Sequence, residues 1–190
     1  MRQIRGDFGV GTSVIGIRAA LGALTVAASA LLTPPAGAQV TFGSPNGPAR
    51  LALGAGAFNI TPSSGHADSR TAAEFRGEYR FGDMWWIIAP FVGASVTSQG
   101  ATFGYFGFGF DVNFGPNWVL TPNAAAGVFE KGSGLNLGSW WEFRTGGELA
   151  YRFANQSRLG IEITHTSNAG IGKLNPGEQS ALLMYSIPMH

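Results

Sequence analysis

The chain has 190 residues, of which 45% are hydrophobic, 12% aromatic and only 12% charged, with a formal net charge of +1. Average soluble domains contain about 25% charged residues, so this charge content is low, and 14 Phe and 5 Trp argue against a disordered chain. The near-neutral charge excludes a basic nucleic-acid-binding surface, the lack of Cys excludes disulfides and thiolate zinc sites, and the length suits one domain.

The first segment in chain order, residues 1–38, has the pattern of a secretory signal peptide. Basic residues precede an apolar run over residues 19–32, and the small residues of a cleavage site follow at residues 36–38. The run is too short to cross a hydrocarbon core of about 30 Å as a helix, which disfavours a retained N-terminal anchor. We therefore expect residues 39–190 to form an exported domain.

The exported part contains stretches in which apolar and polar residues alternate, separated by Gly, Pro, Asn and Asp. Such period-two patterns predict β-strands, and no later run of 18 apolar residues predicts a membrane helix. We predict eight strands. They cover residues 50–60, 71–81, 85–97, 101–114, 117–129, 140–153, 157–167 and 179–189.

The polar face of several predicted strands is charged. In the second strand, Phe75 and Tyr79 share one face while Glu74 and Arg76 share the other. The strands at 71–81, 140–153 and 157–167 together carry five Glu and five Arg on this face. Because the charges balance, we expect them to form ion pairs inside a small barrel.

Large aromatic side chains decide which face meets water. Trp141, Phe143, Tyr151, Phe103 and Tyr105 would overfill a narrow lumen, whereas a lipid-facing surface accommodates them. Eight strands with turns need about 130–160 residues, which fits the exported part. We therefore predict an all-β fold, an eight-stranded antiparallel transmembrane β-barrel whose lumen is filled with side chains. A soluble lipocalin-like barrel is the alternative.

A candidate catalytic pair interrupts the apolar face of the strand at 157–167. His165 and Ser167 are two residues apart, so they share a strand face, and an imidazole beside a hydroxyl can take the proton of a serine nucleophile. The side-chain amide of Asn168 and the backbone N–H of Gly170 are candidate oxyanion donors. Alternatively, these residues simply mark where the strand leaves the membrane.

At this point the sequence resembles a known family. The run from His165 to Gly170, the turn Asn175-Pro176-Gly177-Glu178 and the alternating last strand are similar to PagL, the lipid A 3-O-deacylase family of Gram-negative outer membranes. The resemblance implies an outward-facing Ser-His-Glu triad that hydrolyses the ester-linked acyl chain at position 3 of lipid A. It implies Ser167 as the nucleophile, His165 as the general base, lipopolysaccharide as the substrate, and neither a metal nor an organic cofactor.

The third member of the triad departs from the family pattern, which usually places Glu two residues after the Gly of Asn-Pro-Gly. Here that position is Gln179. Alternation puts Gln179 on the lipid face and Glu178 on the lumen face, because a shift of one residue reverses a side chain. We expect a bulge near Gly177 to turn Glu178, the carboxylate of this region, toward His165. Gln179 is the alternative third member, and an impaired enzyme is another.

Two other functions stay open on the sequence alone. The chain could be a non-catalytic small outer-membrane barrel or a degenerate deacylase, in which case its expression leaves the mass of lipid A unchanged. It could also be a soluble lipid-binding barrel, in which case it is found outside the membrane fraction. The expected partners are lipopolysaccharide and outer-membrane lipids, with no nucleic acid, and the sequence leaves open a monomer or a homodimer.

Overall fold

The computed structural model describes residues 39–44, 47–62, 70–82 and 85–189. The predicted signal peptide, residues 1–38, lies outside the described residues and stays a prediction. Within the described part of the chain, no helix is long and apolar enough to cross a membrane. The regular structure there consists of antiparallel β-strands.

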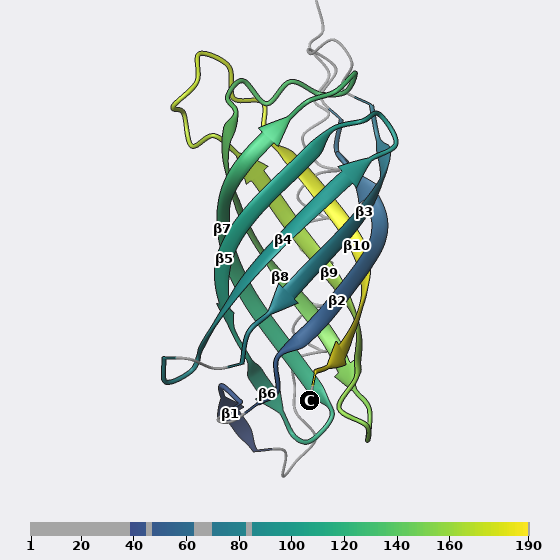
Figure 1. Ribbon diagram of the computed structural model, residues 1–190, viewed down its shortest axis with the longest axis vertical. Helices are drawn as coiled ribbons and strands as arrows, with labels where there is room; N and C mark the ends of the chain where they lie inside the picture. The colour runs from purple at the N-terminus through teal and green to yellow at the C-terminus, as the bar shows by residue number, and fades with distance from the viewer. Residues whose placement is uncertain (1–38, 45–46, 63–69, 83–84, 190) are drawn as a thin grey trace, which may run out of the picture. The chain divides into compact units, whose positions relative to one another are not determined.

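Eight of these strands close into a barrel (Figure 1). Each pairs with the next along the chain, and the last pairs back with the first at what we call the closing seam, β10 against β2. The barrel strands are β2 Arg50–Phe58, β3 Ala72–Arg80, β4 Ile88–Thr97, β5 Thr102–Phe110, β7 Trp118–Glu130, β8 Trp141–Arg152, β9 Arg158–Ser167 and β10 Glu178–Pro188.

The predicted fold class is therefore confirmed, and each predicted strand has its counterpart. The stretch at 101–114 is interrupted at Asp111, after which β6, Val112–Phe114, continues it against β7. A further short strand, β1 at Val40–Phe42, pairs with β6. The sequence analysis did not predict β1.

The two ends of the barrel differ in their connections. The connections 131–140 and 168–177, the short turn at 98–101 and the described residues 59–62 and 70–71 between β2 and β3 gather at one end, which we call the upper end (Figure 1). The opposite or lower end holds β1, β6 and the start of β9. Outer-membrane barrels have short periplasmic turns and longer extracellular loops, so the upper end has the character of the extracellular side.

Charged residues fill much of the lumen. The Arg76 guanidinium contacts Glu74 at 2.7 Å and Glu162 at 2.8 Å, and these side chains are at most 2% exposed. Arg144 bonds to Glu78 at 2.9 Å. Burying one partner of such a pair alone would cost several kcal/mol. The predicted ion-pair network inside the barrel is therefore present.

The prediction that Phe103 and Tyr105 face lipid is wrong. Both side chains are buried in the barrel, and the Tyr105 hydroxyl donates to Glu78 at 2.8 Å. The lumen has room for these rings because glycine shares their face of β5: a Cβ at Gly107 would lie 2.6 Å from the ring of Phe91. The outward aromatic residues of β5 are instead Phe106 and Phe108.

The outer surface of the barrel is apolar around its whole girth, with aromatic residues at both ends. Trp118 and Tyr151 meet edge to face at the lower end, and Trp140 and Trp141 do so at the upper end. Exposed Leu, Ile and Val side chains cover the strands between them. This pattern of an apolar band between aromatic girdles is typical of a lipid-facing barrel.

Candidate active site

Strand β9 presents His165 and Ser167 on the outer face of the barrel. Burial alternates along the strand, so that Thr164 and Thr166 point inward while His165 and the apolar residues before it are exposed. Ser167 is the last residue of β9 and lies at the upper end. Among the described residues, its hydroxyl has no hydrogen-bond partner. The two side chains therefore share the lipid-facing surface at its upper rim.

Gln179 is the residue beside the imidazole. In the pairing of β9 with β10, Gln179 stands opposite His165, and its Nε2 lies 3.1 Å from His165 Nδ1. The Gln179 Oε1 accepts a hydrogen bond from the Thr61 hydroxyl, and its backbone carbonyl accepts one from the Ile60 N–H at 2.8 Å. The amide is thus held between the ring and the start of the 59–71 connection.

Glu178 does not turn toward His165, contrary to our expectation. Its pairing with Thr166 is regular, without the bulge that would reverse the side chain. The carboxylate is 2% exposed inside the barrel, where it accepts hydrogen bonds from the Ser180 hydroxyl at 2.9 Å and from the Asn59 N–H at 3.3 Å. Glu178 therefore follows the regular alternation of β10 and points into the lumen, although a carboxylate beside His165 would stabilise a charged imidazole.

Asn168 does not offer its amide to a ligand either. Its Nδ2 donates to the carbonyls of Leu137 at 2.8 Å and Leu174 at 2.7 Å, while its Oδ1 accepts from the Gly170 N–H at 2.9 Å. Both expected oxyanion donors are therefore already bonded. Asn168 is fully buried, and its hydrogen bonds join the 131–140 connection to the 168–177 connection near Ser167.

The backbone N–H of Ala169, two residues after Ser167, is another candidate donor. Ala169 has a positive φ of 54°, which is uncommon for a residue other than glycine. Within the described chain its N–H makes no hydrogen bond, whereas the neighbouring Ile171 N–H bonds to the Asn168 carbonyl. The sequence gives no sign of this, because it depends on how Asn168 folds the connection.

Gly177 allows the backbone to lie in close contact with the imidazole of His165. Its φ is 64°, and a Cβ at this position would lie 2.8 Å from His165 Cε1. Any other residue here would adopt an unfavourable positive φ, and its Cβ would clash with the imidazole ring. The connection between β9 and β10 therefore limits where the His165 ring can lie.

Apolar side chains surround the pair on the barrel surface. Phe143 stands opposite Ser167 on β8, and Ile163, Ile161 and Leu183 are between 57% and 59% exposed below His165. A hydroxyl and an imidazole placed in this setting can act on an ester whose acyl chain lies in the membrane. No group of three or more His, Cys, Asp or Glu in the described part of the chain could hold a metal ion.

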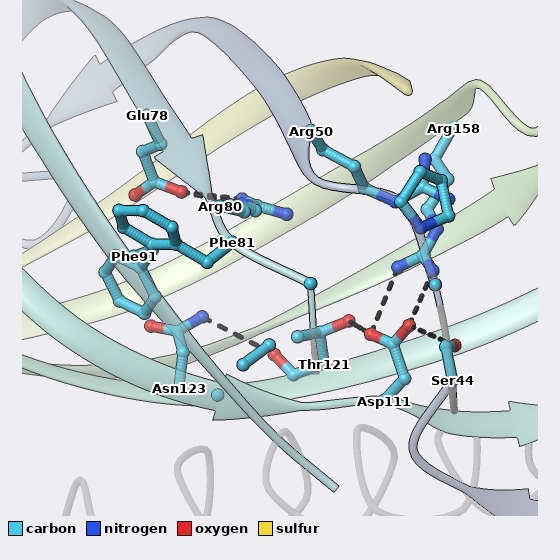
Figure 2. A pocket seen from close by; sticks show the side chains of 15 residues that line it. Ser44, Arg50, Glu78, Arg80, Phe81, Phe91, Asp111, Thr121, Asn123 and Arg158 are labelled. Atoms are coloured by element: carbon cyan, nitrogen blue, oxygen red, sulfur yellow. Dashed lines mark hydrogen bonds and ion pairs between the residues drawn. The ribbon is translucent and has the colours of Figure 1, made fainter. Parts of the chain in front are cut away.

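A polar pocket lies inside the lower end of the barrel, at the opposite end of β9 (Figure 2). Asp111 lines it and accepts hydrogen bonds from Arg158 at 3.0 Å, Thr121 at 2.8 Å and Ser44 at 3.0 Å. The cavity volume is about 50 Å³, which is room for a few water molecules. An acylated sugar does not fit there, so the rim of the outer surface is the better candidate site.

Comparison with known proteins agrees with the barrel fold and identifies a family. The sequence matches the model of the family described as lipid A 3-O-deacylase (PagL) over residues 57–188. The crystal structure of the outer membrane enzyme PagL is similar with a TM-score of 0.61 and 21% identity, covering 74% of this chain and 99% of that one. A de novo designed transmembrane β-barrel has a TM-score of 0.51 at 12% identity, covering 76% and 98%. No curated protein matches.

Proposed function

Because the chain belongs to the PagL family of lipid A 3-O-deacylases, we propose that it hydrolyses the ester-linked 3-O acyl chain of lipid A in the outer leaflet of a Gram-negative outer membrane. The observation that carries the proposal is the outward-facing pair of His165 and Ser167 at the upper rim. Lipopolysaccharide occupies that leaflet, so the substrate reaches the pair sideways from the membrane.

The proposed reaction runs through an acyl-enzyme. Ser167 Oγ attacks the carbonyl carbon of the ester while His165 Nε2 takes the hydroxyl proton. The tetrahedral intermediate collapses, the C–O bond to the sugar breaks, and His165 gives the proton to the departing sugar oxygen. A water molecule, deprotonated by His165, then attacks the acyl-serine. The bond from the acyl carbon to Ser167 Oγ breaks, His165 returns the proton to Oγ, and the fatty acid leaves. The Ala169 N–H is the proposed donor to the oxyanion.

In this proposal Gln179 orients the imidazole in place of a carboxylate. For Nε2 to accept the serine proton, the ring must carry its other proton on Nδ1 and donate it to an acceptor. Gln179 supplies that acceptor when its Oε1 faces the ring. Gln179 is uncharged, and loss of the orienting carboxylate in other triads costs about 10⁴ in turnover. This favours a second candidate function, a degenerate barrel with little or no activity.

The test is the mass of lipid A from membranes that contain the protein. We expect the loss of one hydroxyacyl chain with the wild type, and no loss with Ser167→Ala or His165→Ala, while both variants keep the heat-dependent gel mobility of a folded barrel. Glu178→Gln is the matched control: it keeps an acceptor for Asn59 inside the barrel and should leave activity near the wild-type level. Unchanged lipid A with both the wild type and Gln179→Glu would support the non-catalytic alternative.

A further inference from the structure

The segment that follows β2 is fixed along the start of β10 by three successive contacts. The Asn59 N–H bonds to Glu178 Oε2 at 3.3 Å, the Ile60 N–H bonds to the Gln179 carbonyl at 2.8 Å, and the Thr61 hydroxyl bonds to Gln179 Oε1. The first two involve the backbone of the segment. The backbone contacts of Asn59 and Ile60 therefore place the Thr61 hydroxyl beside the Gln179 side chain.

An amide beside an imidazole has two orientations with opposite chemical consequences. With Nε2 toward His165, the amide donates to Nδ1, so a neutral ring carries its proton on Nε2 and cannot accept one from Ser167. With Oε1 toward His165, Nδ1 carries the proton and Nε2 is free to act as the base. A carboxylate has two equivalent oxygens and poses no such choice.

We propose that Thr61 is a positioning residue for the deacylation reaction, acting through Gln179 on the tautomer of His165. The inference rests on the proposed function of the pair His165 and Ser167. A hydroxyl both donates and accepts, so Thr61 holds the amide against the ring in either orientation. It donates to Oε1 in the inactive orientation and accepts from Nε2 in the active one.

The role of Thr61 predicts opposite effects for two substitutions at this exposed position. Thr61→Val has no polar group to hold the amide, so kcat falls about tenfold or more while KM changes little. Thr61→Asp only accepts, so it draws Nε2 to itself and turns Oε1 toward His165. If the two orientations are equally populated in the wild type, kcat rises about twofold, and it rises further if the inactive one dominates.

Matched variants separate positioning from a structural role. Thr61→Ser and Thr61→Asn both present a donor and an acceptor, so both should stay near the wild-type rate. In a Gln179→Glu background, Thr61→Val should cost much less than it costs with Gln179, because the carboxylate needs no orientation. An equal loss in both backgrounds, or a Thr61→Asp enzyme no faster than Thr61→Asn, would overturn the inference.

A spectroscopic measurement tests Thr61 independently of turnover. The ¹⁵N shifts of the imidazole, recorded on labelled protein in detergent micelles and assigned with His165→Ala, report which ring nitrogen carries the proton. We expect Thr61→Asp to shift His165 toward the form protonated on Nδ1, and Thr61→Asn to leave it unchanged. This response without any deacylation would refute the proposed function alone, whereas Ser167-dependent deacylation without this response would refute the role of Thr61 alone.

Discussion

Replacing Gly177 with Ala tests the position of the His165 ring more finely than removing the ring. A Cβ at Gly177 would lie 2.8 Å from His165 Cε1. Carbon atoms in contact prefer a separation of about 3.5 Å or more, so the ring has to retreat by roughly 0.7 Å. The retreat would disturb the contact of Nδ1 with the Gln179 amide, which is 3.1 Å long. A misplacement of about 1 Å can lower a rate about 100-fold, and we expect kcat to fall by about 10- to 100-fold.

Gly100→Ala is the matched control for the backbone cost. Gly100 has a φ of 77°, close to the 64° of Gly177, and a Cβ there would meet no atom within 4 Å. A left-handed conformation costs an L-residue about 1–2 kcal/mol, so both variants should lose about that much free energy of unfolding. Gly100 lies in the connection from β4 to β5, strands that carry neither His165 nor Ser167, and its substitution should leave kcat unchanged.

The assay for both glycine variants follows release of the hydroxy fatty acid from lipid A in detergent micelles by mass spectrometry. Urea unfolding monitored by tryptophan fluorescence gives the stability of each. Equal losses of activity in the two variants, or a Gly177→Ala enzyme that keeps more than half of the wild-type kcat, would show that this glycine does not hold the ring.

Two further substitutions test the upper connections and the lumen. In Asn168→Asp, a carboxylate cannot donate to the two carbonyls that the amide now joins, so deacylation should fall about tenfold or more while the urea midpoint of the barrel stays unchanged; a parallel fall in both would mean that Asn168 supports the barrel itself. In Arg76→Met, two buried glutamates lose their counter-charge, so the free energy of unfolding should fall by about 3–5 kcal/mol; an unchanged urea midpoint would show that the pairs contribute nothing.

The barrel could be predicted from the sequence because most strands carry chemically different residues on their two faces. On β3, Glu and Arg alternate with Phe and Tyr, and burial in the structure follows that alternation. On β5 both faces are aromatic, so hydrophobicity could not say which one faces lipid. A signal was nevertheless present: Asp111 has the same parity as Phe103 and Tyr105, and a carboxylate at that position belongs inside the barrel.

For the candidate site, strand alternation predicted which side chains face outward and which face the lumen, but not which groups they contact. Alternation already placed Gln179 on the outer face and Glu178 in the lumen, and the structure has both there. We expected a bulge because a carboxylate orients an imidazole better than an amide does, but nothing local forces one. The contacts of Asn168 with Leu137 and of Thr61 with Gln179 could not be inferred, because each joins residues that are distant in the sequence.

The closing seam has a consequence for a newly made chain on its way to the membrane. Gln179 belongs to the last strand of the barrel and Thr61 follows the first, so the contacts proposed to orient the imidazole form only after the two ends of the sheet have met. A chain still in transit, or one inserted but open, carries the serine and the histidine without that support. On the proposed mechanism, the chain becomes able to hydrolyse an ester only at the final step of assembly, when the barrel closes in the membrane.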